Sequence, residues 1–165
     1  MSMEEKQNSQ TSLDFNQNIF KPSSREEIVE IVKNCYKKNI PLEINGLKSK
    51  NKIGRNFQSE KTLDLSDYKG IIEYKPEELY IKVKAGTPLK EIVEELDKNN
   101  QQLAFEPNDF GYLFSGESNC GSIGGVVSCN FAGSRRFKVG SVRDHILGFQ
   151  GINGKGETIK SGGTV

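Results

Sequence analysis

The sequence has little of what marks several large classes of protein. No uninterrupted apolar run approaches the roughly 20 residues that a membrane-spanning helix requires, and the polar amino terminus lacks the basic start and apolar stretch of a signal peptide. The 23 Lys and Arg residues nearly balance the 22 Asp and Glu residues, which argues against a general binder of nucleic acids or anionic membranes. We therefore expect a cytoplasmic protein that has no transmembrane segment, binds no nucleic acid and reaches a membrane, if at all, through partner subunits.

Cysteine and histidine are scarce as well. The three cysteines are an odd number, which argues against a disulfide framework, and the spacing of Cys120 and Cys129 matches no common metal site. His145 is the single histidine and has no matched nucleophile, so it is weak evidence for acid–base catalysis. We expect no metal site, and the sequence identifies no catalytic residue.

Glycine, by contrast, is present and unevenly spread. Residues 1–110 contain four of the 17 glycines and residues 111–165 contain thirteen. This shift predicts two small lobes, over residues 18–110 and 111–165, after a polar lead-in over residues 1–17 that we expect to be disordered. A chain of 165 residues is long enough to bury a core in each lobe.

The first lobe has the pattern of alternating helix and strand. Ser24 and Glu27 form a capping-box pair at the start of a helix. Short strands are expected over 42–44 and 63–65. The apolar face of the helix is expected to consist of Ile28, Ile31, Val32, Cys35 and Tyr36.

The later part of the first lobe predicts a βαβ unit. A strand over 79–85 leads to a helix capped by Thr87, with Pro88 at its first position, and a second strand follows over 103–105. The apolar face of this helix is expected to consist of Leu89, Ile92, Val93 and Leu96.

The second lobe is predicted to be rich in strand. Residues 146–152 and 157–160 are expected to form a hairpin around a turn at Asn153-Gly154.

One candidate binding segment directly follows the strand that ends at Ile44. Ligands usually bind at the carboxyl ends of strands in an α/β layer, and successive backbone N–H groups in such a loop suit a phosphate or diphosphate. Local composition alone favours an ordinary polar loop. The residues of this segment are Asn45, Gly46, Leu47, Lys48, Ser49 and Lys50.

A second candidate is the small-residue stretch over 121–130. Its paired glycines let another backbone or a flat ligand approach closely, and its hydroxyl and amide groups can hydrogen-bond a phosphate or a ring heteroatom. A tight strand entry with close packing explains the same residues equally well. The side chains and glycines considered are Gly121, Ser122, Gly124, Gly125, Ser128 and Asn130.

Two further basic stretches offer cations. Arg135 and Arg136 can neutralise an anionic cofactor or substrate, although at least one of them is expected to be an ordinary surface cation. Arg143 and Asp144 are expected to fix the start of the following strand by pairing their charges rather than to take part in catalysis.

Five segments, in this order, resemble the FAD-binding domain of flavoproteins of the vanillyl-alcohol oxidase and p-cresol methylhydroxylase class, and within it the FAD-binding E subunits of glycolate oxidases. The resemblance covers about residues 18–165. The segments are Phe20 to Ser24, Pro41 to Gly46 with Gly54-Arg55, Lys84 to Leu89, Gly121 to Gly125, and Gly133 to Arg136 with Val142 to Asp144.

The resemblance implies an α+β fold of two lobes, a small parallel α/β lobe and an incomplete antiparallel β lobe, with FAD between them. It implies that the loop at 45–50 wraps the diphosphate of FAD, that Pro107 and the segment from Gly121 to Asn130 contact the rest of the cofactor, and that FAD is bound without a covalent link because the loop contains no histidine. The implied partners are a second flavin subunit and an iron–sulfur subunit, with a small 2-hydroxy acid as the substrate of the whole complex.

Three departures from the family pattern bear on this interpretation. Leu47 and Lys48 stand where members of the class often have further glycines, and the connection over 112–120 is longer than usual. Related subunits also continue past the position of Val165 into a cap domain that contributes to the substrate site. We therefore expect the FAD-binding part of a glycolate-oxidase-like 2-hydroxy-acid dehydrogenase. The alternatives are a non-catalytic scaffold subunit or fragment with weak or no FAD binding, and a binder of a different phosphate ligand.

Overall fold

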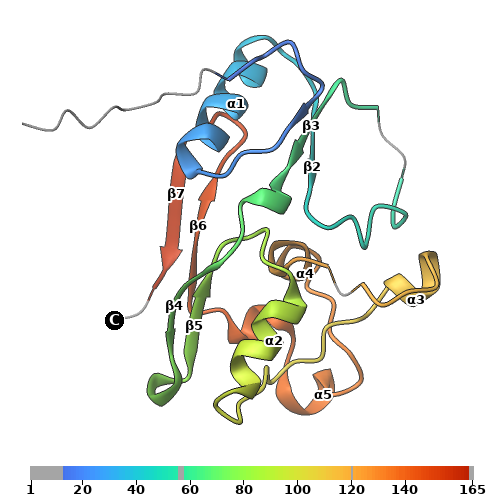
Figure 1. The fold of residues 1–165 in the computed structure, drawn as a ribbon, viewed down its shortest axis with the longest axis vertical. Coiled ribbons are helices and arrows are strands. Elements are labelled where there is room, and N and C mark those ends of the chain that lie inside the picture. The colour runs from blue at the N-terminus through green and yellow to red at the C-terminus, as the bar shows by residue number, and fades with distance from the viewer. Residues whose placement is uncertain (1–12, 56–57, 120, 164–165) are drawn as a thin grey trace, which may run out of the picture.

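The computed structural model describes residues 13–55, 58–119 and 121–163. It combines a three-stranded parallel sheet, two antiparallel hairpins and several short helices (Figure 1), which confirms the predicted α+β class. The helices are α1 (Arg25–Lys37), α2 (Leu89–Asp97), α3 (Gly111–Phe114), α4 (Ile123–Cys129) and α5 (Arg136–Val139), with 3₁₀ turns η1 (Leu65–Asp67), η2 (Pro76–Glu78) and η3 (Val142–His145). The strands are β1 (Ile19–Phe20), β2 (Leu42–Asn45), β3 (Lys61–Asp64), β4 (Ile71–Lys75), β5 (Tyr80–Val83), β6 (Gly148–Ile152) and β7 (Thr158–Gly162).

The parallel sheet has the strand order β1-β3-β2, and all three strands run the same way. β3 therefore lies in the middle, and Leu63 on it is 2% exposed, packed with Phe20 of β1 against α1. The carboxyl ends of β2 and β3 meet at one edge of the sheet, where Asn45 pairs in register with Asp64. Loops that leave this edge start side by side, which is the arrangement that binding sites in parallel sheets use.

Helix α1 forms as its sequence predicts. The Ser24 side chain accepts a hydrogen bond from the Glu27 backbone N–H at 3.2 Å, and the Glu27 carboxylate accepts from the Ser24 N–H, so the capping box is confirmed. Ile31 is fully buried in the core beneath the helix. Tyr36, which the periodicity placed on the same apolar face, is instead 53% exposed in the last turn of the helix.

The lead-in falls partly on residues 1–12, which lie outside the described residues. The part that the structure describes is packed: Leu13 and Phe15 contact the core around α1. The Lys61 ammonium donates to the carbonyl oxygens of Phe15 and Gln17 at 2.9 and 2.8 Å. Residues 13–17 are therefore tied to β3 rather than loose.

The predicted βαβ unit is wrong. β5 pairs antiparallel with β4, a strand that the sequence reading missed, and residues 103–105 form no strand. Leu79 adopts a left-handed conformation with φ 58° at the end of η2, which allows a short turn between β4 and β5. Leu79 is therefore not part of the strand, although the sequence predicted that the strand begins there. Leu103 and Phe105 pack instead into a second core with Leu89 of α2.

Thr87 has a different role from the predicted helix cap. Its hydroxyl donates to the carbonyl oxygen of Lys84 at 2.6 Å and accepts from the Gly70 N–H at 2.9 Å, so the side chain ties the β4–β5 hairpin to the start of α2. Thr87 is fully buried, and Pro88 is the residue at the cap position. Helix α2 buries Ile92 and Leu96, whereas Val93, expected on the same face, is 41% exposed.

The glycine-rich segment after residue 110 folds mainly as short helices before it reaches a hairpin. α4 packs into the second core through Val126, which is 1% exposed, beside Val142 of η3. The predicted strand-rich second lobe is therefore correct only for β6 and β7, which pair antiparallel.

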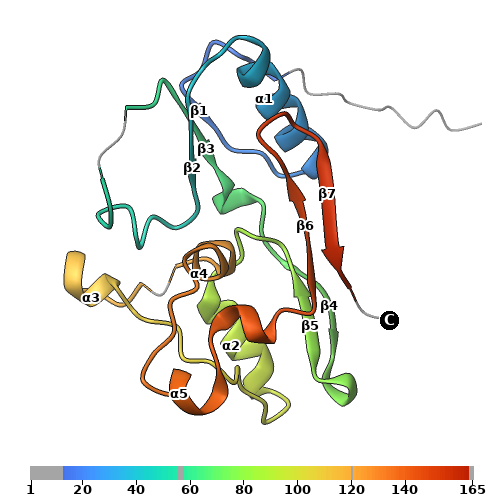
Figure 2. The ribbon, with the colours of Figure 1, turned by 180° about the vertical axis from the view of Figure 1, so that it is seen from behind.

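The β6–β7 hairpin extends back to α1 at the other end of the molecule (Figures 1 and 2). The Arg25 guanidinium of α1 donates to side-chain oxygens of Gln150 and Thr158 on the two strands. The loop is longer than the predicted two-residue turn, because the Asn153 side-chain oxygen accepts from the backbone N–H groups of both Lys155 and Glu157. The last strands of the chain thus cover the first helix.

Gly156 allows the hairpin loop to approach α1. It has φ 79° and is buried, and a Cβ there would meet the Lys33 side chain and lie 3.1 Å from the Val29 carbonyl oxygen. Gly156→Val is expected to lower the free energy of unfolding in urea by about 1–3 kcal/mol. Gly154→Val is the control, because a Cβ at that exposed loop position has no atom within 4 Å. Equal losses in the two variants would contradict the close contact between the hairpin loop and α1.

Asp64 links stability to pH. Burial raises the pKa of the Asp64 carboxyl, but hydrogen bonds from Ser66 and the charges of Lys21 and Lys48 outweigh burial and hold that pKa below its ordinary value. A depressed pKa stabilises the fold above pH about 4, and this contribution is lost as the pH falls through the folded-state pKa. In Asp64→Asn, urea unfolding is therefore expected to depend less on pH below about 4 than in the wild type. Parallel pH dependence of the two proteins would contradict this role.

Candidate cofactor-binding site

A cavity of about 680 Å³ lies between the carboxyl end of β2 and the start of α4, within the size range of ligand pockets. We call it the β2–α4 cavity. It brings together two of the predicted binding segments, which are separated by more than 70 residues in sequence. Its lining comprises Glu43, Ile44, Asn45, Gly46, Leu47, Lys48, Ser49, Lys50, Asn51, Ile53, Arg55, Leu65, Ala85, Ser122, Gly124, Gly125, Ser128 and Cys129.

The loop after β2, residues 46–53 and here called the β2 loop, offers backbone donors to this cavity. Within the described part of the chain, no group accepts a hydrogen bond from the backbone N–H of Leu47, Lys48 or Ser49. Lys48 has φ 57°, a left-handed backbone conformation. Glycine adopts this conformation at a lower energetic cost than lysine does. Three successive unpaired amides beside a cavity are suited to an anion.

The other wall of the cavity is built around Ser122, the cap of α4. Its side chain accepts from the Gly125 N–H at 3.4 Å, and it is 4% exposed. Gly46 lies directly against it, because a Cβ at Gly46 would collide with the Ser122 hydroxyl oxygen. The β2 loop and α4 therefore touch, and glycine at position 46 is what allows the contact.

The backbone amides of α4 are already used within the protein. The N–H of Ile123 donates to the Thr87 carbonyl oxygen at 2.9 Å, and the N–H of Gly124 donates to the Ala85 carbonyl oxygen at 2.8 Å. These bonds fix α4 to the segment after β5. Among the described residues of the two predicted segments, the unpaired backbone donors found at Leu47, Lys48 and Ser49 thus belong to the β2 loop.

The two glycines of α4 differ in what surrounds them. A Cβ at Gly124 would lie 2.8 Å from the Ala85 carbonyl oxygen, so Gly124 is required for close packing. A Cβ at Gly125 would lie 3.5 Å from the Ser122 hydroxyl oxygen, an ordinary contact. Gly125 therefore borders space in the cavity that a side chain could occupy without displacing a neighbouring atom.

The charges around the cavity are mostly positive. Lys48, Lys50 and Arg55 line it together with a single carboxylate, that of Glu43. Lys48 is exposed, and its charge contributes to lowering the pKa of Asp64 beneath the loop. Cations beside unpaired amides favour a ligand with negative charge.

Three residues that the resemblance implied do not line the cavity. Pro107 lies beside Glu106, whose carbonyl oxygen accepts from the Gly133 N–H at 2.7 Å. The Asn130 side chain accepts from the Arg143 N–H at 2.9 Å. Gly121 packs behind the cavity wall, where a Cβ would meet the Ser49 hydroxyl oxygen.

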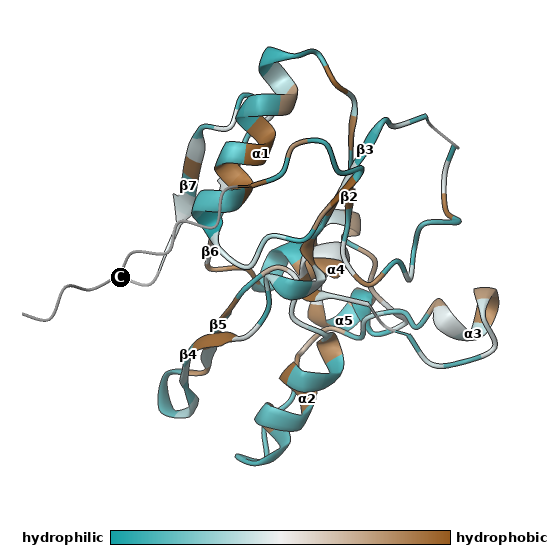
Figure 3. Cartoon of the chain, turned by 45° about the horizontal axis from the view of Figure 1, so that its top comes forward, coloured by the Kyte–Doolittle hydropathy of each residue, from teal (hydrophilic) through white to brown (hydrophobic). Residues whose placement is uncertain are grey.

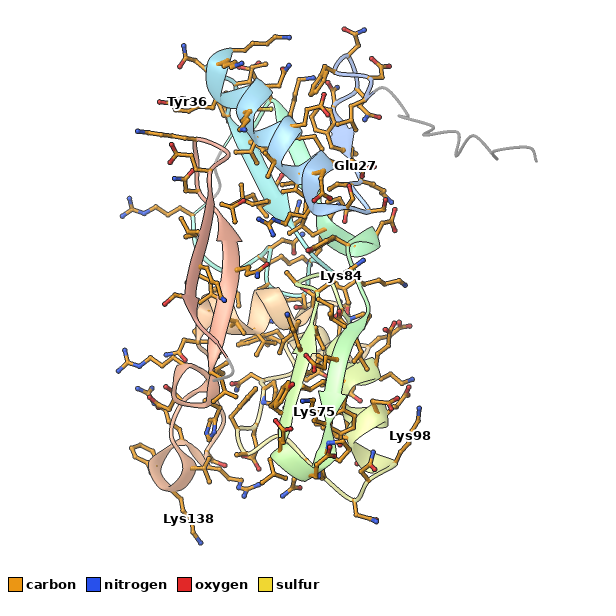
Figure 4. All side chains as sticks on the ribbon, turned by 90° about the vertical axis from the view of Figure 1, so that its left-hand side faces the viewer. Glu27, Tyr36, Lys75, Lys84, Lys98 and Lys138 are labelled. Carbon is orange, nitrogen blue, oxygen red and sulfur yellow. The ribbon has the colours of Figure 1, made fainter. Side chains whose placement is uncertain are left out.

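The basic stretches of the third candidate lie elsewhere. Arg135 is 4.0 Å from the Glu106 carboxylate, and Arg143 pairs with Asp144 at 3.7 Å, both on the surface. Figure 4 shows Lys138 of α5 at the far end of the molecule from α1. His145 uses its Nε2 in a contact of 2.8 Å with the Val139 carbonyl oxygen, which is a structural role.

The sequence reading missed several lining residues. Leu65 directly follows β3, and Ala85 lies just after β5. Both line the cavity, although neither was predicted as a site residue. Ile53 is the last residue of the β2 loop, and Arg55 lies two residues after it. Arg55 stood in a segment that carried the family resemblance, which was the one signal that could have added it.

These residues fit the diphosphate of FAD. A dianionic bridge needs convergent donors, neighbouring cations and close access to the backbone, and the β2 loop supplies unpaired amides beside three cationic side chains. Apolar side chains at Ile44 and Ile53, which are 65% and 39% exposed, offer surface for a flat ring. In the ranges 13–55, 58–119 and 121–163, no cluster of His, Cys, Asp and Glu is suited to hold a metal ion, and no helix is long and apolar enough to cross a bilayer.

Comparison with known sequences gives the same cofactor. Residues 17–162 match the FAD binding domain family. The chain is 37% identical over 140 residues to glycolate oxidase subunit GlcE of Escherichia coli K12, covering 85% of this chain and 38% of that protein. It is 27% identical over 148 residues to D-lactate dehydrogenase of Anaerostipes hadrus, covering 89% of this chain and 29% of that protein. The chain thus spans well under half of these relatives, and the first of them confirms the resemblance to glycolate oxidase subunits.

Solved structures share the fold at low sequence identity. Alkyldihydroxyacetonephosphate synthase superposes with a TM-score of 0.70 at 20% identity, over 87% of this chain and 26% of that chain. Phl p 4.0202, a glucose dehydrogenase, also superposes with a TM-score of 0.70, at 12% identity, over 87% of this chain and 28% of that chain. Because the family match extends over nearly all of the described residues, this chain belongs to the FAD binding domain family, and FAD is the cofactor that this membership indicates.

Proposed function

We propose that this chain is the FAD-binding part of a glycolate-oxidase-like 2-hydroxy-acid dehydrogenase, and that the β2–α4 cavity holds the diphosphate of FAD. The observation that supports this most is the set of unpaired backbone amides at Leu47, Lys48 and Ser49, beside cationic side chains and opposite the open space at Gly125. The relatives that are glycolate oxidase and D-lactate dehydrogenase proteins support the same class of substrate.

In this proposal, the chain's own residues bind and orient the cofactor. The amides of the β2 loop donate to the diphosphate oxygens, and Lys48, Lys50 and Arg55 neutralise their charge. The flavin, when bound, supplies the acceptor for the hydride that leaves the substrate carbon. We also propose that FAD is held non-covalently, since the β2 loop has no histidine, the residue through which some members of the class anchor the cofactor.

The partners in this proposal are further subunits of the same complex. A chain that supplies a cofactor cradle needs other parts to bind substrate and to carry electrons away, and one relative is itself named as a subunit of glycolate oxidase. We propose a second flavin subunit and an iron–sulfur subunit in these roles, with a small 2-hydroxy acid as the substrate of the assembly. In this scheme Asn45, Ser122 and Ser128 line the cofactor site from the two sides of the cavity.

A second candidate function is a scaffold subunit that retains the fold with weak or no FAD binding. The hydrogen bonds of the Ile123 and Gly124 amides favour it, since they remove one of the two predicted sets of donors. The Leu47 side chain favours it too, because it stands in the loop where glycines leave room in the class. FAD titration of the purified chain separates the two functions: a colourless protein that takes up no added FAD would contradict the first and support the second.

The open position at Gly125 provides the sharpest variant. Gly125→Arg is expected to abolish FAD uptake, measured by flavin absorbance after gel filtration and by fluorescence titration, because the side chain fills the cavity. The added positive charge would by itself attract a diphosphate, so a loss of uptake is steric in origin. Folding is expected to survive, since a Cβ at this position makes only an ordinary contact.

Gly154→Arg is the matched control. It adds the same side chain at an exposed position with no atom within 4 Å, and it is expected to bind FAD as the wild type does. Circular dichroism of both variants checks the fold. Unchanged FAD uptake by Gly125→Arg would overturn the placement of the cofactor in the β2–α4 cavity.

A further inference from the structure

A small arm contacts the β2 loop but contributes no lining residue to the β2–α4 cavity. It consists of residues 109–119, including α3, and is here called the α3 arm. The Asp109 carboxylate closes it, accepting from the backbone N–H groups of Gly111 and Asn119, both at 2.8 Å, and from the Ser118 hydroxyl at 2.6 Å. Most of the arm belongs to the connection over 112–120, which is longer than the family pattern predicts.

The α3 arm projects from the body of the molecule and presents an apolar tip. Figure 3 shows hydrophobic residues on α3 at a distance from α1 and α2. Within the arm, the ring of Phe114 stacks on Phe110 with centroids 6.3 Å apart, and Phe110 in turn meets Phe131 at 5.4 Å. The arm is thus a compact unit with an aromatic base.

Contacts between described residues join the α3 arm to the β2 loop. The Asn119 side-chain amide donates to the carbonyl oxygen of Leu47 at 3.2 Å, and the Lys52 ammonium donates to the carbonyl oxygen of Phe114 at 3.1 Å. The ammonium groups of Lys50 and Lys52 each lie 5.9 Å from a ring centroid, of Phe110 and Phe114 respectively. Contacts therefore reach the β2 loop near its start and near its end.

The β2 loop has few bonds of its own to hold its shape. Internal backbone bonds between its described residues run from the Asn51 N–H to the Lys48 carbonyl oxygen and from the Ile53 N–H to the Lys50 carbonyl oxygen, at 3.4 and 3.0 Å. Lys48 also holds a left-handed conformation that costs a non-glycine residue about 1 kcal/mol. A loop with this strain and with unpaired amides needs outside contacts to stay in one conformation.

We propose that the α3 arm holds the β2 loop in the conformation that binds FAD, with Lys52 and Asn119 as positioning residues. This inference rests on the proposed function. The Lys52 ammonium donates to the Phe114 carbonyl oxygen of the arm, and Lys52 does not line the cavity. Lys52 therefore contributes to FAD binding by keeping the β2 loop in shape. The arm thereby does for this chain what additional glycines do in the loops of the class: it lets the backbone keep an otherwise unfavourable conformation.

The first test needs no cofactor. Trypsin cleavage after Lys48 and Lys50 reports how often the β2 loop opens, and cleavage after exposed Lys138 on α5 is the internal reference. Lys52→Met removes both contacts of that side chain, and Asn119→Asp removes the donor to Leu47 while keeping the oxygen that accepts from the Gly121 N–H. In each variant, cleavage of the loop is expected to rise about fivefold relative to the reference, the effect of losing one hydrogen bond.

The second test measures FAD affinity by fluorescence titration of the full chain. Lys52→Met is expected to raise the Kd for FAD about fivefold with no change in the urea unfolding midpoint, and Lys52→Arg, which keeps the charge and the donor, is expected to restore it. Lys155→Met is the control for loss of one charge, because that residue is exposed in the β6–β7 loop.

The outcomes separate this inference from the proposed function. Wild-type rates of loop cleavage in both Lys52→Met and Asn119→Asp would overturn the role of the arm. An unchanged Kd in Lys52→Met, with FAD bound by the wild type, would overturn it as well. A wild type that takes up no FAD would overturn the proposed function and the cofactor half of this inference, while the cleavage result would still decide whether the arm holds the loop.

Discussion

The close approach of the β2 loop to the start of α4 is the constraint on which the rest of the structure depends. Gly46 lies where any side chain would strike Ser122, and Gly124 lies where any side chain would strike Ala85. These contacts fix α4 against both the parallel sheet and the end of β5. The cavity exists because the two walls meet at small residues and diverge at Gly125, where space remains.

The two walls of this cavity differ in whether their backbone amides are already hydrogen-bonded. α4 uses its first amides to bind the segment after β5, so it acts as a rigid wall. The β2 loop leaves amides unpaired and places cations around them, so it acts as the anion-binding side. Membership of the FAD binding domain family gives this arrangement its cofactor. In our further proposal, contacts from the α3 arm hold this loop in one conformation.

The sequence predicted the elements whose signals are local. The capping box at Ser24 and the 3.6-residue period define α1, and the β6–β7 hairpin was recognised within two residues at each end. The partner of β5 could not be predicted, because a strand pattern does not say which strand lies beside it. β5 was assigned to a βαβ unit, although it pairs with β4 across a bulge that interrupts the alternation. α4 was missed because glycine pairs disfavour helix, and hydrogen bonds to residues 85 and 87 hold it.

The same limits apply to the candidate site. Asn45 to Lys50 and Gly121 to Asn130 were chosen for their chemistry, and the fold brings these two segments to one cavity, although Gly121 and Asn130 do not line it; their role in FAD binding stays a prediction. Leu65 could not be chosen, because an ordinary apolar residue becomes a lining residue only through the fold. Ala85 stood in a segment that carried the family resemblance, but nothing in its own chemistry singled it out. Pro107 was carried over from the family by position, and the hydrogen bond between Glu106 and Gly133 holds that stretch elsewhere.

The backbone amides of the β2 loop can be observed directly while FAD binds. In a nitrogen-edited NMR titration of the purified chain with FAD, we expect the amide resonances of Leu47, Lys48 and Ser49 to shift and their hydrogen exchange to slow, because these donors gain acceptors. The amides of Ile123 and Gly124, already bonded within the protein, should keep their exchange rates. FAD binding that leaves the three loop amides unchanged would contradict the account.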